Sequence, residues 1–305
     1  ALTFFGRSTS YAELDAKVRS VAAGLRALGV RKGDRVALLM PNCPQHVIAY
    51  WAVLHLGAVA VEHNPLYTAH ELRHPFNDHG ARFAICWDKI VPVLEDLRNN
   101  TPLETIIAVN MLQDLPFVMR TALSIPLPKL RAARAKLHSS APQVMGFDAL
   151  LHDAVGGDGH DLQADESITA DDTAVMMYTS GTTGSPKGAQ LSHQGLVANI
   201  LQGKAWVPGL GKEREISLGV LPMFHAYGLT IVTNLSMLIG AELVLVPAPE
   251  IPLIMKVMKN NRPTWVPGVP TLYEKIVEAA ERDNVDLSGV KFAFCGAATL
   301  PVSLV

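Results

Sequence analysis

The sequence predicts an α/β protein made of two doubly wound, mainly parallel-sheet subdomains. Short apolar runs with strand character alternate with helical patterns along most of the chain, and such alternation builds parallel β-α-β units with right-handed crossovers. The length of 305 residues exceeds that of a typical single domain. We therefore expect a first subdomain over residues 1–165 and a second over residues 166–305.

In the first subdomain, capping signals and apolar periodicity define the elements. Ser10–Glu13 forms a capping box, and apolar residues recur at three- and four-residue steps until Gly29, which predicts a helix. A second capping box, Thr68–Glu71, starts another. Apolar runs predict buried strands over 36–40, 59–62, 83–86 and 105–109, with further helices over 45–56 and 91–97.

Residues 110–138 interrupt this alternation with an apolar and basic stretch. It contains five basic residues and a single acid, Asp114, and apolar residues such as Phe117 and Val118 lie beside the basic cluster. One interpretation is contact with a membrane surface or anionic lipid. We favour the other, a solvated excursion between the subdomains, because Pro116, Pro126 and Pro128 prevent one continuous amphipathic helix.

The second subdomain follows a polar, acidic stretch over 153–172 that is typical of a linker. Apolar runs then predict strands over 174–178, 216–221, 243–246, 265–266 and 292–295. Helices are expected between them, over 192–202, up to 238, over 253–258 and over 272–281. Ligands of such folds gather at the carboxyl ends of the strands.

The most informative segment, Tyr178–Gly188, follows the strand predicted at 174–178 and reads Tyr-Thr-Ser-Gly-Thr-Thr-Gly-Ser-Pro-Lys-Gly. Its glycines allow backbone N–H groups to approach an anion, and its lysine supplies a compact positive charge. A solvated turn alone would not need a lysine among hydroxyl side chains. The segment is not a Walker A loop, since Gly188 and Ala189 follow Lys187 in place of Ser or Thr. We expect a phosphate-binding loop.

This loop resembles the signature of the acyl-adenylate-forming (AMP-binding) superfamily, which includes acyl-CoA synthetases, luciferases and the adenylation domains of peptide synthetases. The signature Thr-Ser-Gly-Thr-Thr-Gly-x-Pro-Lys-Gly is matched at every position from Thr179 to Gly188. The resemblance implies a set of residues that contact the triphosphate of ATP and the departing pyrophosphate: Thr179, Ser180, Gly181, Thr182, Thr183, Gly184 and Lys187. It also implies that a threonine hydroxyl, Thr182, lies near a magnesium ion.

Two further segments resemble signatures of the same family. Phe224–Gly228 reads Phe-His-Ala-Tyr-Gly, and the resemblance implies that His225 borders the acyl site and gates it. Cys295–Pro301 is similar to a turn of small residues whose backbone, at Gly296, Ala297 and Ala298, contacts the adenine and the acyl carboxylate. Thr299 stands where the family commonly has proline.

The reaction that the resemblance implies has two steps, with ATP, magnesium and coenzyme A taking part. A carboxylate attacks the α-phosphate of ATP to give an acyl-adenylate and pyrophosphate, and coenzyme A then takes the acyl group. Amino-acid-activating members usually carry an aspartate in the second signature, which reads Phe-Asp-x-Ser, whereas Phe224–Tyr227 holds no acid. Because Val266–Tyr273 is also similar to fatty acyl-CoA ligases, we expect a fatty acid substrate, with an aryl or other carboxylic acid as the alternative.

The family continues with a Tyr-Gly-x-Thr-Glu motif, a Thr-Gly-Asp motif and a C-terminal domain that carries a catalytic lysine, and none of these occurs in the 305 residues. The resemblance therefore implies the N-terminal portion of a ligase, without a complete catalytic set and inactive by itself. Two rival hypotheses remain: a short protein that binds nucleotide or lipid without catalysis, and a phosphotransferase that uses the loop as a kinase does.

For a protein of lipid metabolism, as the resemblance implies, composition bears on the class of partner and on the cellular compartment. The formal net charge of −2 does not favour a nucleic acid partner. Cys43, Cys86 and Cys295 are widely spaced and odd in number, which argues for a reducing compartment. We expect a cytoplasmic protein with peripheral membrane contact as an option. His70 and His74 have helical spacing, but no third ligand accompanies them, so a metal site is not favoured.

Overall fold

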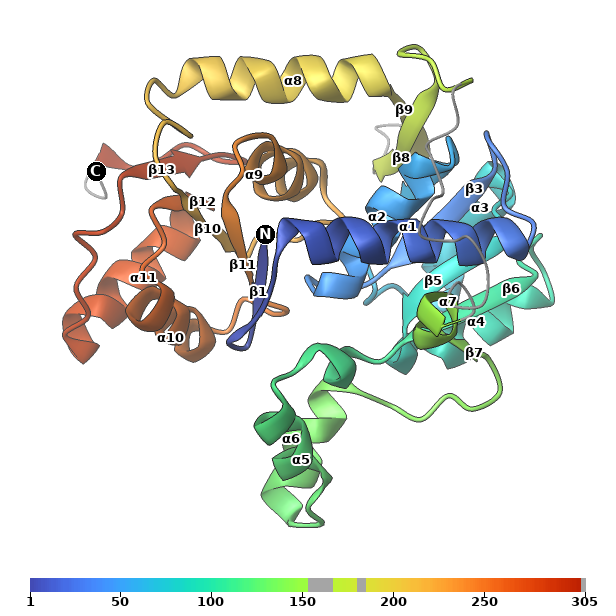
Figure 1. The fold of residues 1–305 in the computed structure, drawn as a ribbon, viewed down its shortest axis with the longest axis horizontal. Coiled ribbons are helices and arrows are strands. Elements are labelled where there is room, and N and C mark those ends of the chain that lie inside the picture. The colour runs from blue at the N-terminus through green and yellow to red at the C-terminus, as the bar shows by residue number, and fades with distance from the viewer. Residues whose placement is uncertain (153–166, 180–184, 303–305) are drawn as a thin grey trace. The chain divides into compact units, whose positions relative to one another are not determined.

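The computed structural model describes residues 1–152, 167–179 and 185–302. These residues form two compact units, one of Tyr11–Leu196 and the other of Ala1–Ser10 with Val197–Val305. Each unit is built on its own mainly parallel sheet (Figure 1), as the fold class predicted from the sequence requires.

The Tyr11–Leu196 unit contains a seven-stranded sheet in the order β7-β6-β5-β3-β4-β8-β9. All its neighbours are parallel except β8 and β9, which pair antiparallel. Its strands are β3 (Arg35–Leu39), β4 (Val59–Glu62), β5 (Phe83–Trp87), β6 (Thr105–Val109), β7 (Met145–Gly146), β8 (Thr173–Thr179) and β9 (Lys187–Ser192).

The helices of this unit are α1 (Tyr11–Ala27), α2 (Pro44–His55), α3 (Ala69–His79), α4 (Val91–Arg98), α5 (Phe117–Ser124), α6 (Pro128–Leu137) and α7 (Phe147–His152). The Thr68–Glu71 capping box is confirmed, because Thr68 Oγ1 accepts from the Glu71 N–H at 3.4 Å and Glu71 Oε2 accepts from the Thr68 N–H at 2.8 Å. One continuous hydrophobic core packs α3 and α4 against β3, β5 and β6.

The other unit contains a six-stranded sheet in the order β13-β12-β10-β11-β1-β2. Its strands are β1 (Leu2–Phe4), β2 (Arg7–Thr9), β10 (Ile216–Gly219), β11 (Glu242–Leu245), β12 (Trp265–Gly268) and β13 (Phe292–Cys295). Its helices are α8 (His193–Trp206, of which residues from Val197 belong here), the π-helix Gly228–Asn234, α9 (Leu235–Leu238), α10 (Ile251–Asn261) and α11 (Pro270–Asp283).

The division of the chain differs from the boundary expected between residues 165 and 166. Strand β8 continues the first sheet because it pairs in parallel with β4, from Ala60↔Val175 to Glu62↔Met177, and β9 extends that sheet further. The first ten residues belong to the other unit, since β1 pairs in parallel with β11. Neither pairing leaves a local signal in the sequence, because both join segments far apart in the chain.

The interruption at residues 110–138 forms two short helices, α5 and α6. Pro116 is the N-cap of α5 and Pro128 lies in the first turn of α6, positions that proline tolerates because no helical N–H is lost there. The prolines thus separate two helices, which agrees with the expectation that no continuous helix forms. Among the described residues, no helix is both long and apolar enough to cross a membrane.

Candidate functional site

The predicted phosphate loop connects the two strands of an antiparallel hairpin at the carboxyl end of β8. Strand β8 ends at Thr179, β9 begins at Lys187, and these two residues are paired in register. Directly opposite residues of such a pair present their side chains on the same face. Of the predicted contacts, Thr179 and Lys187 are described and both are exposed. Ser180, Gly181, Thr182, Thr183 and Gly184 lie outside the described residues.

The strand β9 was missed by the sequence analysis, which expected the segment after the loop to lead only to a helix near Ser192. Its sequence Lys-Gly-Ala-Gln-Leu-Ser carries little of the apolar alternation that marks a strand. The consequence is chemical. A loop between two strands is not followed directly by a helix, so no helix dipole adds positive charge to it. In the described part of the loop, Lys187 supplies the positive charge for an anion.

The end of the loop is positioned by a hydrogen bond and by a close glycine contact. His74 Nε2 donates to the Pro186 carbonyl at 3.0 Å, which ties α3 to the residue before Lys187. A Cβ on Gly188 would lie 3.0 Å from Met176 Sδ and 3.1 Å from Tyr178 Cζ. Gly188 therefore lets β9 pack closely on β8 at the residue after Lys187.

The start of the loop rests on a cluster of aromatic and imidazole side chains around Tyr178. The ring of Tyr178 stacks on His63, with centroids 5.6 Å apart, and meets His79 edge-on at 5.8 Å. Its hydroxyl donates to Asp78 Oδ2 at 2.6 Å, and burial together with this partner raises the pKa of Tyr178. These contacts hold the carboxyl end of β8 against α3.

Two buried histidines in this cluster are joined by a hydrogen bond, and its direction follows from their surroundings. His63 Nε2 and His79 Nε2 lie 3.1 Å apart, and His79 Nδ1 accepts from the Ala81 N–H at 3.0 Å. His79 therefore carries its proton on Nε2 and donates to His63. Burial lowers the pKa of His63 to about 3, and burial, His63 and Arg35 lower the pKa of His79 to about 2. Both imidazoles are neutral at neutral pH.

In the other unit, the second and third signatures follow neighbouring strands of the six-stranded sheet. Strand β12 pairs in parallel with both β10 and β13, so the segments after Gly219, Gly268 and Cys295 leave the same edge. That edge carries the carboxyl ends of the strands, where ligands of open α/β sheets bind. The structure thus brings His225 and the Gly296–Ala298 turn to one edge.

The second signature enters a π-helix whose first residue is Gly228. A Cβ at this position would lie 2.0 Å from the Pro222 carbonyl oxygen, a distance no side chain can accept. The glycine therefore permits the close turn that places His225, whose N–H donates to the same Pro222 carbonyl at 3.1 Å. The His225 side chain is exposed, and the centroids of the His225 and Phe224 rings lie 4.7 Å apart. Partial desolvation lowers the pKa of His225.

Tyr227 connects the second and third signatures. Its hydroxyl donates to the Phe294 carbonyl at 2.5 Å and to the Gly268 carbonyl at 3.2 Å. A Cβ on Gly296 would lie 2.9 Å from the Tyr227 ring, so only glycine allows the ring to pack there. Burial raises the pKa of Tyr227, which keeps its hydroxyl a donor. The sequence analysis did not assign Tyr227 this role, although the aromatic residue next to His225 was a usable signal.

The predicted Gly296–Ala298 turn lies at the surface of its unit. Gly296 is half-buried, whereas Ala297 and Ala298 are exposed. Ala297 has φ of 68°, a left-handed conformation that side-chain-bearing residues seldom adopt and that concentrates at functional sites.

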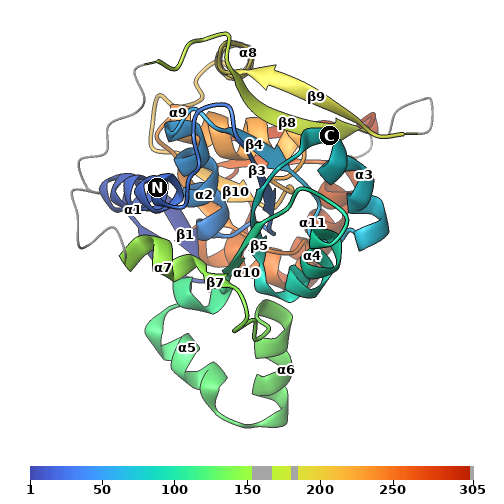
Figure 2. The ribbon, with the colours of Figure 1, turned by 90° about the vertical axis from the view of Figure 1, so that its right-hand side faces the viewer.

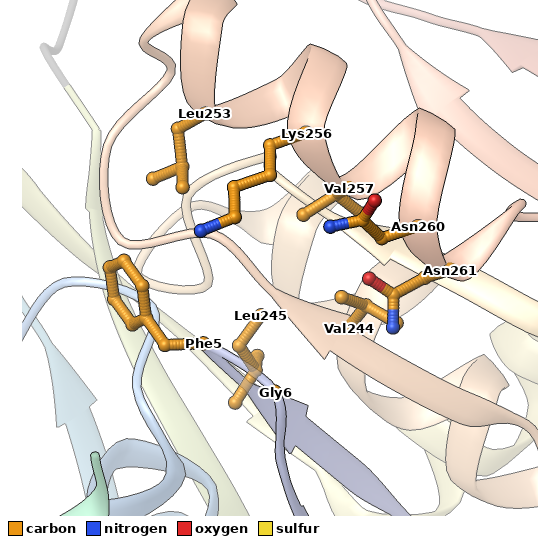
Figure 3. Close-up of a pocket in the computed structure, with 9 residues that line it drawn as sticks. All are labelled: Phe5, Gly6, Val244, Leu245, Leu253, Lys256, Val257, Asn260 and Asn261. Carbon is orange, nitrogen blue, oxygen red and sulfur yellow. The ribbon is translucent and has the colours of Figure 1, made fainter. Parts of the chain in front are cut away.

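A cavity of about 160 Å³ lies apart from these motifs, between the β1–β2 turn and α10 (Figure 3). Phe5, which has φ of 49°, and Lys256 face it from opposite sides. None of the site residues predicted from the sequence lines this cavity. Within residues 1–152, 167–179 and 185–302, no group of three or more His, Cys, Asp or Glu side chains is arranged to hold a metal ion.

Comparison with known proteins gives consistent matches along the whole chain. The chain is 33% identical over 304 residues to a long-chain-fatty-acid–CoA ligase of Bacillus subtilis, covering 100% of this chain and 53% of that protein. It is 33% identical over 307 residues to 4-coumarate–CoA ligase 4 of Arabidopsis thaliana, covering 98% and 48%. The chain thus spans about half the length of these curated relatives.

A long-chain-fatty-acid-CoA ligase (FadD1) from Archaeoglobus fulgidus has a similar fold, with a TM-score of 0.79 at 22% identity, over 100% of this chain and 56% of that one. The model of the family described as AMP-binding enzyme matches residues 1–305. The resemblance of the three signatures, their placement at strand ends and this match agree, and the chain belongs to the AMP-binding enzyme family.

Proposed function

We propose that the protein carrying this chain is an ATP-dependent, AMP-forming acid–CoA ligase whose acyl substrate is a fatty acid. The observation that carries the proposal is the 33% identity, along the whole chain, to a long-chain-fatty-acid–CoA ligase. The three signatures at the carboxyl ends of β8, β10 and β13 support it. The rival phosphotransferase finds less support, because the loop joins two strands and does not enter a helix directly.

Adenylation joins two anions, so this chain's main task is to supply donors, positive charge and positioning. We assign Thr179 and Lys187 to the phosphates, together with Ser180, Gly181, Thr182, Thr183 and Gly184. Lys187 provides a compact charge for the departing pyrophosphate. The carboxylate needs no general base, since its pKa near 4 leaves it ionised at neutral pH.

We assign the acyl and adenine contacts to the six-stranded unit. His225, neutral because its pKa is lowered, borders the acyl group, and the backbone of Gly296, Ala297 and Ala298 receives the adenine and the carboxylate. Magnesium, when bound, neutralises phosphate charge. Its proposed ligand Thr182 lies outside the described residues, and the coenzyme A contacts are likewise not assigned to described residues.

An aryl acid is the second candidate substrate, and a specific observation supports it. The 4-coumarate–CoA ligase 4 relative has the same identity, 33%, as the fatty acid–CoA ligase relative. Both substrate classes have neutral tails, which suits the absence of an acidic residue in Phe224–Tyr227.

The three free cysteines suit a reducing compartment, and we propose a cytoplasmic location.

The test is acid-dependent exchange of labelled pyrophosphate into ATP by the full-length protein. The panel contains short-, medium- and long-chain fatty acids beside 4-coumarate. We expect exchange with fatty acids, and we expect Lys187→Ala to lower it roughly 100-fold because the phosphates lose a charged donor. Lys259→Ala, an exposed lysine on α10, is the matched control and should change nothing. Exchange with 4-coumarate alone would reject the fatty acid, and phosphate transfer without adenylate would reject the ligase.

A further inference from the structure

Helices α5 and α6 form a hairpin, residues 117–137, that stands out from the seven-stranded unit (Figures 1 and 2). No residue of α6 is buried, and α5 buries only Leu123. Helices of eight and ten residues are marginal in water by themselves and normally gain their stability by packing an apolar face. Within the described residues, almost none of the hairpin's apolar side chains is buried by packing against the rest of its unit.

The base of the hairpin is nevertheless fixed to the unit. Trp87 Nε1 donates to the Leu137 carbonyl at 2.8 Å, and Lys89 Nζ donates to the Ala135 carbonyl at 2.8 Å. His138, just after α6, forms a hydrogen-bonded pair with the buried Asp88. These bonds satisfy the last carbonyls of α6 and hold the hairpin in its projecting position.

Large apolar side chains on the hairpin face solvent. The exposed fractions are 72% for Phe117, 77% for Val118, 47% for Ile125 and 55% for Leu127. Ile125 and Leu127 occupy the turn between the helices. Apolar side chains at a projecting turn and along one short helix are typical of surfaces that enter the headgroup region of a bilayer.

The hairpin carries only positive charge. Its sequence contains five basic residues and no Asp or Glu: Arg120, Lys129, Arg131, Arg134 and Lys136. The nearby Asp114 is buried and forms an ion pair with Lys17 of α1 at 3.6 Å. Asp114 is thus engaged by Lys17, and within the described residues Arg120, Lys129, Arg131 and Arg134 form no ion pair, so their positive charge is open to an anion from outside these residues.

A cavity of about 280 Å³ at the base of the hairpin gives this anion a defined place. Arg120 of α5 and Arg134 of α6 both line it, so two basic residues from different helices border one space. Asn110 lines it too, and because Asn110 Oδ1 accepts from the Leu112 N–H at 3.0 Å, its amide NH₂ is left to donate. Paired guanidinium groups with an added amide donor suit the oxygens of a phosphate group.

We propose that the hairpin of residues 117–137 docks on an anionic phospholipid surface, with Phe117, Val118, Ile125 and Leu127 at headgroup level and Arg120 and Arg134 holding a lipid phosphate. The proposal takes up the interpretation that the sequence analysis did not favour, because exposed apolar side chains, positive charge and a cavity lined by two arginines occur together on the hairpin. The proposal is independent of the proposed function, since it uses none of the residues assigned to ATP or the acyl group.

The test is co-sedimentation of the full-length protein with vesicles of phosphatidylcholine alone or mixed with phosphatidylglycerol. We expect binding to the mixed vesicles only, weakened by salt. Arg120→Gln with Arg134→Gln should lower the partition coefficient roughly 10- to 30-fold, because each basic residue near the surface contributes on the order of one kcal/mol. Phe117→Ser with Val118→Ser should lower it as well, through lost apolar burial.

Two control variants match these changes outside the hairpin. Arg73→Gln with Arg98→Gln removes two exposed arginines of α3 and α4, and Leu66→Ser removes an apolar side chain that is 77% exposed, as Val118 is. Both should bind as the unchanged protein does. Equal binding to neutral vesicles, no vesicle binding, or equal losses in hairpin and control variants would each overturn the proposal. Pyrophosphate exchange with a soluble acid should remain unchanged in every variant.

Discussion

The carboxyl edges of the two sheets are built by different means. Beneath the phosphate loop, the seven-stranded sheet relies on side-chain hydrogen bonds and ring stacking among Tyr178, His63 and His79. At the six-stranded sheet, Gly228 and Gly296 allow main chain and rings to approach within distances that a Cβ would forbid. The ring cluster of the first edge depends on protonation states, and the closest approaches at the second edge depend on the absence of side chains. Gly188 at the first edge and the Tyr227 hydroxyl at the second add a smaller contribution of the opposite kind.

This difference suits the proposed tasks of the two edges. The phosphate-binding task proposed for the loop is suited by a rigid support whose two histidines stay neutral, with Lys187 supplying the positive charge. A surface that receives a flat base or an acyl group needs exposed backbone, which small residues provide. The two edges should therefore respond differently to steric substitutions and to pH.

The largest effect is expected from a steric change at the six-stranded edge. Gly228→Ala would bring Cβ within 2.0 Å of the Pro222 carbonyl oxygen, and main chain cannot move away as a flexible side chain could. We expect a loss of at least about 3 kcal/mol in the free energy of unfolding, measured by urea denaturation.

Gly203→Ala is the matched control in the same unit. Gly203 lies in α8, and its Cβ would meet Ile231 at an ordinary 3.7 Å. Because alanine favours a helix more than glycine does, this variant should be neutral or gain up to about 1 kcal/mol. Equal losses in both variants would show that the Gly228 contact is not the cause.

The second largest effect is expected from acidification, which should destabilise the seven-stranded edge through its two buried histidines. The unfolded histidines take up protons below their ordinary pKa of 6.5, whereas the folded values are about 3 for His63 and about 2 for His79. Stability from this pair is thus fully present above about pH 6.5 and is lost as the pH falls toward the folded values. Between pH 6.5 and 5 the loss should be about 2 kcal/mol per histidine.

The measurement compares urea denaturation at several pH values for the unchanged protein and for His63→Gln with His79→Gln. The double variant should lose less stability on acidification, because Gln does not titrate, while acid losses from carboxylates such as Asp172, whose pKa is lowered, remain in both. His70→Gln, an exposed histidine of α3, should follow the unchanged protein. Parallel pH profiles in all three would contradict the neutral-pair assignment.

Much of this architecture could be predicted from the sequence because its signals are local. The capping box at Thr68, the apolar runs of β3 and β5 and the position of the phosphate loop after β8 depend on residues close together in the chain. The fold class followed from their alternation. The order of strands within each sheet required pairings between distant segments, such as β1 with β11, that no local pattern reports.

The candidate site was predictable to the same extent. The motifs point to Thr179, Lys187, His225 and Gly296 as candidate site residues, but not to the residues that contact them. Tyr227, Gly228 and His74 contribute a hydroxyl, an absent Cβ and an imidazole whose roles depend on which carbonyl or ring lies opposite. Such partners come from the tertiary fold, so the motif alone cannot name them.

The smallest effect is expected from a change at His74, which tests the support of the loop while leaving the charge of Lys187 in place. His74→Phe keeps a ring on α3 but removes the hydrogen bond to the Pro186 carbonyl. Since the side chain is exposed, water can replace the donor, and the free energy of unfolding should change by less than about 1 kcal/mol. The loop end next to Lys187 would nevertheless be held less firmly.

A rise in KM for ATP of several-fold with little change in kcat, measured by pyrophosphate exchange, is therefore expected for His74→Phe. His74→Gln can donate to the same carbonyl through its amide and should restore most of the affinity, whereas a role in general acid catalysis would leave the Gln variant as slow as the Phe variant. Recovery by Gln would separate positioning of Lys187 from chemistry at His74, and it would show that the hydrogen bond to the Pro186 carbonyl is what holds this end of the loop.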